Sequence, residues 1–353
     1  MIKGMKIATM LAAGALALAA CSSSTSGTTT TSPAPAGSAS AKSDVKVGLA
    51  YDIGGRGDQS FNDAAARGLD QAKTELGVEV KELEATAGET DAQKEERLTT
   101  LAEAGYSPII AVGFAYATSL GAVAPKFPKT TFAIVDDASL SEKNPNVTSL
   151  VFAENQGSYL VGAIAAQASK TGNIGFIGGV NVPLIQKFQA GFEAGAKSVN
   201  PNIKIQAKYL TEPPDFSGFG DPQKGQVAAD GMYQAGADVV YHAAGGSGGG
   251  VFKAAVAANK LAIGVDSDQY LTAPADQKPV ILTSMLKRVD VAVYDMVKSS
   301  VDKAPLTGVQ TFDLAKDGVG FSTSNDAVTP YTAKADELKA QIISGAITVP
   351  DKM

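Results

Sequence analysis

The chain of 353 residues contains no Trp, one Cys and one His. A single Cys cannot form an intramolecular disulfide, and with a single His it cannot supply the ligands of a structural zinc site. The same scarcity argues against histidine-based catalytic triads and multi-histidine metal centres. We therefore expect a protein that holds no metal and no cofactor.

Basic residues are also scarce, because 30 Lys and Arg stand against 36 Asp and Glu, for a formal net charge of −6. A nucleic-acid-binding surface needs the opposite balance, so we predict no nucleic-acid partner. The sequence contains neither a Walker A motif nor a G-x-G-x-x-G motif, so we expect no loop for nucleotide phosphates. At roughly 150 residues per domain, the length predicts two domains.

The first 20 residues have the pattern of an export signal. Lys3 and Lys6 precede the apolar run Ile7–Ala20, which is too short to span a bilayer. The run ends in Leu18-Ala19-Ala20-Cys21, which resembles a bacterial lipobox, and the alternative is an ordinary signal with a chance Cys. Because the only Cys of the chain lies at the cleavage point, we predict a signal peptide over 1–20. Cys21 then carries diacylglycerol and palmitate, and the lipoprotein is anchored to the extracytoplasmic face of the cell membrane.

The segment after the signal is too poor in large apolar residues to fold. Residues 22–43 are Ser, Thr, Gly, Ala and Pro apart from Lys42. Such a composition is typical of a flexible linker. We predict a lipidated Cys followed by a disordered tether over 21–43, and a folded part that begins near Asp44.

Strands and helices are predicted to alternate through the rest of the chain. Near-continuous Val, Ile and Ala strands between amphipathic helices indicate parallel sheets covered on both faces. Two such runs imply two α/β lobes, with 45–153 plus 284–308 in lobe one and 154–283 plus 309–353 in lobe two. The predicted strands cover residues 45–51, 78–83, 108–114, 131–135, 146–153, 173–177, 203–209, 238–243, 261–265, 280–286 and 309–314. The predicted helices cover residues 61–76, 92–104, an Ala-rich segment before 131, 155–168, 182–199, 222–235, 251–259, 288–302 and 327–344.

Polar residues follow several of the predicted strands. Asp52, Asp136 and Asp266 each end an apolar strand, and Lys287 ends another. In open α/β sheets the ligand lies just beyond the carboxyl ends of the strands. Three acceptors and one cation suit a neutral ligand rich in hydroxyl and amine donors, and they do not suit a phosphate. The alternative is that each Asp only caps the next helix, but three in the same position favour a site.

Aromatic residues in loops form a second pattern. Phe188 lies on the apolar face of its predicted helix, so we expect it in the core. Phe219 lies in an irregular loop, and Phe61 opens a helix at which Ser60 and Asp63 form a predicted capping pair. One loop ring from each lobe could sandwich a flat base, worth about 1–3 kcal/mol per stack. The alternative for Phe61 is a hydrophobic staple on its own helix.

Two motif matches are interpreted as misleading. Gly245-Gly246-Ser247-Gly248-Gly249 fits the G-x-S-x-G nucleophile elbow, but the only His, His242, precedes the serine on the strand that leads into the turn. We therefore reject a serine hydrolase with this nucleophile elbow and expect these glycines to let the backbone approach a ligand. Arg56-Gly57-Asp58 matches an adhesion tripeptide, and we interpret it as chance.

Several segments together resemble the basic membrane protein family, lipoproteins similar to the purine nucleoside receptor of spirochaetes. The resemblance extends over residues 45–345. Its motifs are 47–52 (Val-Gly-Leu-Ala-Tyr-Asp), 58–62 (Asp-Gln-Ser-Phe-Asn), 132–136 (Phe-Ala-Ile-Val-Asp), 178–179 (Gly-Gly), 244–248 (Ala-Gly-Gly-Ser-Gly), 264–269 (Gly-Val-Asp-Ser-Asp-Gln) and 284–287 (Ser-Met-Leu-Lys). It implies an α/β two-lobed type I periplasmic-binding-protein fold, in which crossing strands join two parallel sheets covered by helices.

The resemblance also implies which residues hold the base of a nucleoside. Two Phe rings sandwich the base in that family, where Phe61 matches the first ring and Phe219 the second. Because segment 211–220 departs from the family pattern, Phe216 is the alternative second ring. Asp136 matches the carboxylate that reads the edge of the base.

Further polar groups are implied around the same pocket. Asp52 and Asn62 match polar groups beside the ligand. Asp266, Lys287 and the backbone of Gly245 match the group that holds the ribose hydroxyls.

The function implied is capture of a nucleoside, most simply a purine nucleoside, and not catalysis. The expected partners are the permease and ATPase subunits of an ABC importer, and the expected state is a monomer. A sugar-binding lipoprotein of an ABC importer is the main alternative. A sensory or adhesive lipoprotein and a nucleoside hydrolase are further alternatives.

Overall fold

The computed structural model describes residues 42–353. The predicted signal peptide, the predicted lipidation at Cys21 and the predicted tether as far as residue 41 lie outside the described residues. Within the described part, no helix is both long enough and apolar enough to cross a bilayer.

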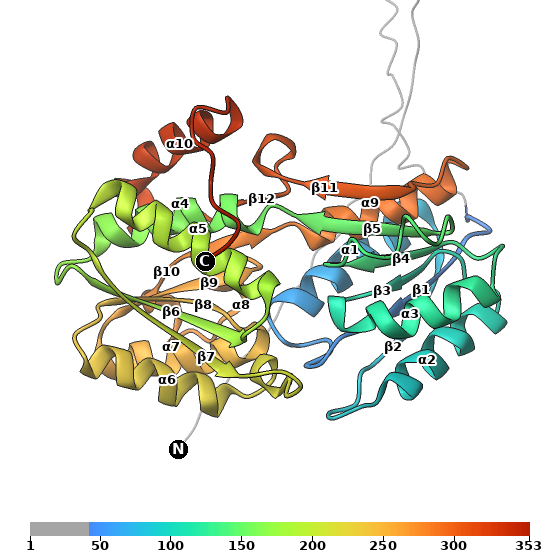
Figure 1. Ribbon diagram of the computed structural model, residues 1–353, viewed down its shortest axis with the longest axis horizontal. Coiled ribbons are helices and arrows are strands. Elements are labelled where there is room, and N and C mark those ends of the chain that lie inside the picture. The colour runs from blue at the N-terminus through green and yellow to red at the C-terminus, as the bar shows by residue number, and fades with distance from the viewer. Residues whose placement is uncertain (1–41) are drawn as a thin grey trace, which may run out of the picture. The chain divides into compact units, whose positions relative to one another are not determined.

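The first lobe is built on a parallel sheet with the strand order β2-β1-β3-β4-β5-β11. Helices α1 and α9 pack on one face and α2 and α3 on the other, so β3 and β4 are buried throughout (Figure 1). The strands are β1 (Lys46–Ala50), β2 (Glu79–Leu83), β3 (Ile109–Ala111), β4 (Phe132–Val135), β5 (Val147–Phe152) and β11 (Gly308–Phe312). The helices are α1 (Phe61–Leu76), α2 (Asp91–Glu103), α3 (Ala117–Val123) and α9 (Val289–Val301).

The second lobe repeats this plan with the order β7-β6-β8-β9-β10-β12, in which only the short β12 is antiparallel to its neighbour. Helices α4 and α5 pack on one face of the sheet and α6 and α7 on the other. The strands are β6 (Asn173–Val180), β7 (Lys204–Thr211), β8 (Val239–Ala243), β9 (Leu261–Asp266), β10 (Ile281–Lys287) and β12 (Val319–Phe321). The helices are α4 (Glu154–Ala168), α5 (Pro183–Val199), α6 (Pro222–Gln234), α7 (Gly248–Ala258), α8 (Gln269–Thr272) and α10 (Thr329–Ile343).

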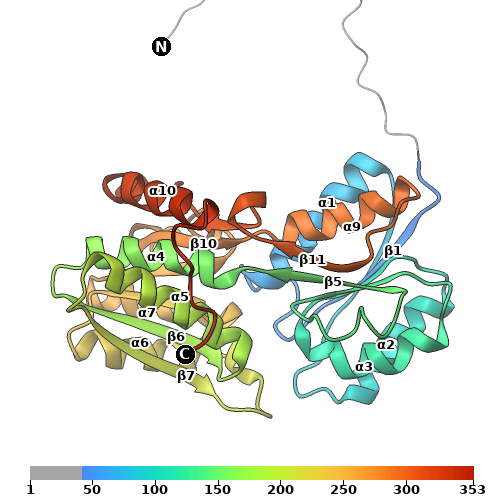
Figure 2. The ribbon, with the colours of Figure 1, turned by 45° about the horizontal axis from the view of Figure 1, so that its top comes forward.

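The chain crosses between the lobes after β5, after β10 and after β11. These crossings correct the predicted division, which placed residues 284–308 in lobe one and 309–353 in lobe two. Strand β10 pairs with β9 as far as Leu286, so it belongs wholly to the second sheet. Strand β11 pairs with β5 in the first sheet, and Figure 2 shows the two side by side. The sequence predicted these strands but carried no signal for which sheet edge each one joins.

The two sheets place corresponding strands in the same positions. Reading each order from its β2 or β7 edge, β4 corresponds to β9 and β5 to β10. Because both sheets are essentially parallel, the carboxyl ends of these strands lie at one edge of each sheet. Of the predicted site residues, Asp136, Asp266 and Lys287 lie at the ends of β4, β9 and β10.

Candidate ligand-binding site

A pocket lined by residues of both lobes lies at the carboxyl ends of the strands. It holds about 550 Å³ of space not filled by atoms, including its opening to solvent, which is within the range of small-molecule sites. All eight side chains or backbones predicted from the sequence lie in its wall: Asp52, Phe61, Asn62, Asp136, Phe219, Gly245, Asp266 and Lys287. The wall also contains Ile53, Asp58, Gly113, Phe114, Leu184, Ile185, Phe188, Ala243 and Val265.

Two of the strand-end carboxylates occupy equivalent places in the two lobes. Asp136 follows β4 and Asp266 ends β9, and both have positive φ, of 70° and 63°. A left-handed backbone is unfavourable for residues other than Gly and is typical of functional sites. Each strand therefore ends in a turn that brings a carboxylate to the pocket.

Lys287 is the cation of the pocket, and it is almost fully buried. Its Nζ donates to Asp136 Oδ2 at 2.6 Å and lies 3.2 Å from Glu154 Oε1. The rings of Phe61 and Phe188 lie 5.1 and 5.5 Å from Nζ, within the range of cation–π contacts. The positive charge is therefore neutralised inside the protein before any ligand enters.

Glu154, which the sequence analysis missed, completes this ion-pair cluster. Its side chain is 1% exposed, and its second oxygen accepts from Lys187 Nζ at 2.7 Å. Glu154 begins α4 two residues after the last residue of β5, and Lys287 is the last residue of β10. The strand-end rule that selected the three Asp residues therefore also covers Glu154.

Burial controls the proton affinities in the pocket. It raises the pKa of Asp266 to about 7, against the opposing effects of Lys287 and the Ser60 hydroxyl. It also raises the pKa of Asp136, although Lys287 acts in the opposite direction, and one Asp136 oxygen is buried without a partner among the described residues. Burial alone would lower the pKa of Lys287, but the surrounding carboxylates raise it. The pocket therefore needs further hydrogen-bond donors at its carboxylates.

Asn62 lines the pocket but uses its amide within the protein. Its Oδ1 accepts from the backbone N–H of Asp52 at 3.0 Å, and its Nδ2 donates to Asp58 at 3.0 Å and to the Ile53 carbonyl at 3.3 Å. The amide joins the loop after β1 to the start of α1. Asn62 therefore holds the position of Asp52.

The predicted capping pair of Ser60 and Asp63 is wrong. The Asp58 carboxylate accepts the backbone N–H groups of Ser60, Asn62 and Asp63 at 2.8–3.1 Å, and the Ser60 side chain makes no capping bond. The carboxylate of Asp63 instead accepts from the loop N–H groups of Gly57 and Gln59. Asp58, two residues before the N-cap residue Ser60, satisfies the free N–H groups that a capping serine would otherwise bind.

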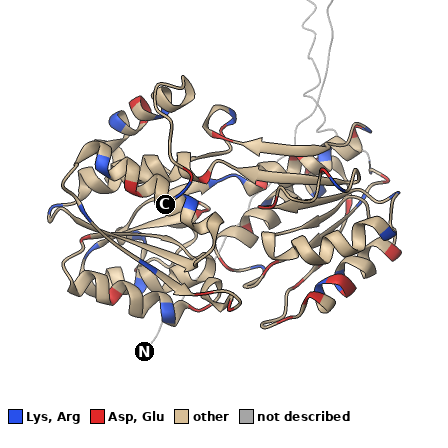
Figure 3. Cartoon of the chain, in the orientation of Figure 1, with Lys and Arg blue, Asp and Glu red and all other residues tan. Residues whose placement is uncertain are grey.

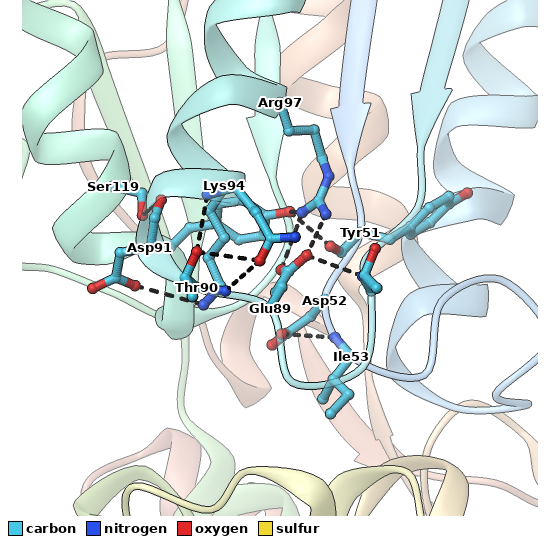
Figure 4. A network of polar contacts seen from close by, with 12 residues as sticks. Tyr51, Asp52, Ile53, Glu89, Thr90, Asp91, Lys94, Arg97 and Ser119 are labelled. Carbon is cyan, nitrogen blue, oxygen red and sulfur yellow. Dashed lines mark hydrogen bonds and ion pairs between the residues drawn. The ribbon is translucent and has the colours of Figure 1, made fainter.

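A polar network supports the other side of Asp52 (Figure 4). Asp52 Oδ1 accepts the backbone N–H of Ile53 at 2.8 Å, and burial raises the pKa of Asp52 to about 7. Behind it, Arg97 forms a largely buried ion pair with Glu89 and bonds the hydroxyl of Tyr116. The Tyr116 hydroxyl donates to the Tyr51 carbonyl at 2.8 Å, so the loop that carries Asp52 is held from two sides.

The two predicted stacking rings come from opposite lobes. Phe61 opens α1 in the first lobe, and Phe219 lies in a short 3₁₀ helix (Ser217–Phe219) in the second. A Cβ at Gly179 would lie 2.4 Å from the Phe219 ring, so only glycine at 179 lets the ring pack there. A hydrophobic staple on its own helix would not explain why Phe61 lies in the wall of the pocket.

Phe216, the alternative second ring, is not in the wall of the pocket. Its ring contacts Phe114 of the first lobe edge-on, with 5.9 Å between centroids. Phe114 does line the pocket. The sequence analysis did not select it because it ends the apolar run 108–114, which was predicted to be a buried strand. Phe188 is buried at 3% exposure, as predicted, but it also lines the pocket, which was not predicted.

The two misleading motifs have structural explanations. Ser247 Oγ accepts from the backbone N–H of Asp221 at 2.8 Å and donates to the Gly218 carbonyl at 2.7 Å, so it bonds loops and is not poised beside His242. Gly245 has a φ of 53° and lines the pocket. Arg56 of the Arg-Gly-Asp sequence forms ion pairs with Asp70 and Glu82 of its own lobe. Acidic and basic residues are interspersed along both lobes (Figure 3).

Comparison with known proteins identifies related chains. Residues 45–353 match the family model of the PnrA-like ABC transporter substrate-binding proteins. The ABC transporter nucleoside-binding protein BmpA of Lactococcus lactis is 35% identical over 88% of this chain and 90% of its own length. The CD4+ T-cell-stimulating antigen of Listeria monocytogenes is 37% identical over 88% of this chain and 89% of its own.

The fold is also found in solved structures. A solute-binding protein of an ABC transporter system from Aeropyrum pernix superposes with a TM-score of 0.74 and 30% identity, covering 87% of this chain and 94% of that chain. The predicted α/β type I fold, with two sheets joined by crossing strands, is confirmed.

Proposed function

Because the chain belongs to the PnrA-like family of ABC transporter substrate-binding proteins, we propose that it captures purine nucleosides between its lobes and delivers them to a membrane permease. The observation that carries this proposal is the combination of rings and carboxylates in one pocket. Phe61 and Phe219 come from opposite lobes, and Asp52, Asp136 and Asp266 lie in the same wall. A nucleoside has the matching parts, a flat base and a hydroxyl-rich sugar.

The proposed pose follows from the chemistry of each group. The base stacks between Phe61 and Phe219, which contributes about 1–3 kcal/mol per ring. The buried oxygen of Asp136 that has no partner among the described residues accepts a donor from the edge of the base. Asp266, with Lys287 and the Gly245 backbone, binds the ribose hydroxyls. Hydrogen bonds to a carboxylate are stronger than neutral ones in such a dry site.

The charge balance favours a nucleoside over a nucleotide. Lys287 is the cation in the wall of the pocket, and it already pairs with Asp136 and Glu154. A phosphate would have to enter beside several carboxylates without a free cation, which is costly in a buried site. A sugar site would hardly need Asp136 in addition to the pair of Asp266 and Lys287, which makes the sugar alternative weaker.

The proposed role in transport also explains how the lobes move, which subunits the protein meets and how it is held at the membrane. The lobes close around the ligand by movement at the crossing strands, and the closed form is recognised by the permease. The ATPase is on another chain, as expected for a sequence without a Walker A motif. We propose that Cys21 carries the lipid anchor on the extracytoplasmic face of the membrane, and that the protein acts as a monomer without catalysis.

A thermal-shift screen of the full chain tests this function. The ligands are nucleosides, free bases, nucleoside monophosphates and sugars. A nucleoside at 100 times its dissociation constant should stabilise the fold by about 2.7 kcal/mol, and monophosphates should not. Stabilisation by sugars alone would favour the sugar alternative. Release of free base from inosine during incubation would favour the hydrolase.

A further inference from the structure

Ser60 has a hydroxyl that its own helix does not use, because Asp58 caps α1 in its place. The Ser60 side chain is nevertheless fully buried. A buried hydroxyl needs a hydrogen-bond partner, and Ser60 finds its partner in the other lobe.

Ser60 bonds residues at the end of β9. Its Oγ donates to Asp266 Oδ2 at 2.5 Å, and its carbonyl oxygen accepts from Ser267 Oγ at 2.7 Å. Arg67, further along α1, donates to the same Ser267 hydroxyl at 2.9 Å. Asp266 and Ser267 are 7% and 2% exposed, so their bonds to Ser60 lie inside the protein, whereas Arg67 reaches Ser267 from the surface. We name these four residues the Ser60 cluster.

The Ser60 cluster exists only when the lobes are in contact, since α1 belongs to the first lobe and β9 to the second. Within it, one oxygen of Asp266 is held by Ser60. A ligand in the pocket that Asp266 lines then meets the other oxygen. A carboxylate fixed by one strong hydrogen bond presents its remaining lone pairs in a defined direction.

We infer that Ser60 is a positioning residue: from the first lobe it orients the Asp266 carboxylate of the second lobe toward the hydroxyl groups of the ligand. Asp266 is therefore ready for its ligand only in the closed protein, which links binding of the sugar part to closure. The identity of the ligand rests on the proposed function, whereas the contact between the lobes does not.

The first test compares Ser60→Ala with Ser158→Ala in calorimetry on the full chain. Ser158 is an equally buried serine whose hydroxyl bonds Tyr241 within the second lobe. Ser60→Ala should weaken adenosine binding about tenfold or more, because a bond to a charged group is lost. The affinity for 2′,3′-dideoxyadenosine, which lacks the 2′- and 3′-hydroxyls of the ribose, should change much less. Ser158→Ala should leave both affinities unchanged.

A double-mutant cycle adds a result that a purely structural role would not give. In an Asp266→Asn chain, Ser60→Ala should cause little further loss, because Ser60 acts through Asp266. Additive losses, or equal losses for adenosine and the dideoxy analogue, would overturn the positioning role.

The second test needs no nucleoside. Spin labels at Lys129→Cys in the first lobe and Lys253→Cys in the second, both exposed, report the distance between lobes in a Cys21→Ser chain. Ser60→Ala should shift the distance distribution of the free protein, and Ser158→Ala should not. If Ser60→Ala shifts the distance distribution but the wild type binds no nucleoside, the contact between the lobes is supported and the proposed function is defeated. If the wild type binds nucleosides and Ser60→Ala has no effect in either test, the inference about Ser60 is defeated and the proposed function is not.

Discussion

Lys287 Nζ lies 2.6 Å from the Asp136 carboxylate, although β10 and β4 belong to different sheets. The pair therefore joins the two lobes at the bottom of the pocket. Glu154, at the start of the crossing helix, is the second carboxylate on the same lysine. The ion-pair cluster thus connects the ligand pocket to two of the crossing segments.

Removing the cation of this cluster should destabilise the fold. Lys287→Met would leave Asp136 buried without its cation and would leave Glu154 paired with Lys187 alone. Removing one partner of a buried ion pair typically costs about 3–5 kcal/mol in the free energy of unfolding. Denaturant unfolding measures the loss. Lys298→Met is the matched control, because its ion pair with Asp302 is about half exposed, at 47% and 52%, and should cost less than about 1 kcal/mol. Similar small losses for both variants would mean that the cluster does not stabilise the fold.

The aromatic sandwich predicts a pattern over three Phe residues. Phe61→Ala and Phe219→Ala should each weaken nucleoside binding by about tenfold to a hundredfold, because each removes one stacking ring. Phe216→Ala should bind almost normally, since its ring contacts Phe114 and is not in the wall of the pocket. Calorimetric titration of the three variants measures the affinities.

Phe188 separates stacking from packing in the same experiment. Phe188 is 3% exposed, so Phe188→Ala should lower the free energy of unfolding by about 3–5 kcal/mol, as for other core Phe residues. Phe61→Ala should lower it much less. Normal affinity in both Phe61→Ala and Phe219→Ala, with lower stability, would favour the staple interpretation of Phe61.

The sequence predicted the elements of the fold well because the hydrophobic periodicity is strong. The helix predicted over 61–76 is the observed α1, and each predicted strand has an observed counterpart. The division into lobes at the C-terminal end was wrong, since periodicity does not tell which sheet edge β10 and β11 join. That information lies in contacts between distant segments.

Eight residues of the pocket wall were also predictable, but the hydrogen-bond partners of these residues were not. Strand ends and family resemblance selected eight residues that the fold brings together. The role of Ser60 was predicted wrongly, because a serine before a helix most often caps it. Asp58, two residues earlier, satisfies the same N–H groups, and only the folded structure shows that the serine hydroxyl meets Asp266 of the other lobe.

The proton affinity of Asp266 predicts how stability depends on pH. Its pKa in the folded protein is about 7, above the ordinary value of 3.8. Between these values the folded state retains a proton that the unfolded chain releases, so stability should fall as pH rises from 4 to 7. One carboxyl contributes at most about 1.4 kcal/mol per pH unit. The ligand-free Asp266→Asn chain should therefore show a shallower decline in urea unfolding than the wild type.

The control for this pH dependence is Asp276→Asn, which changes an exposed carboxyl. It should follow the wild-type curve at each pH. Identical slopes for the wild type and Asp266→Asn would show that the pKa of Asp266 in the folded protein lies near its ordinary value.

Isothermal titration of the full chain with adenosine, inosine and guanosine tests the central claim most directly. We predict saturable binding of one nucleoside per chain, lost or strongly weakened in Phe61→Ala and in Asp266→Asn, with no binding of the corresponding monophosphates. Absence of binding for all three nucleosides, or binding that neither variant alters, would contradict capture of a nucleoside in this pocket.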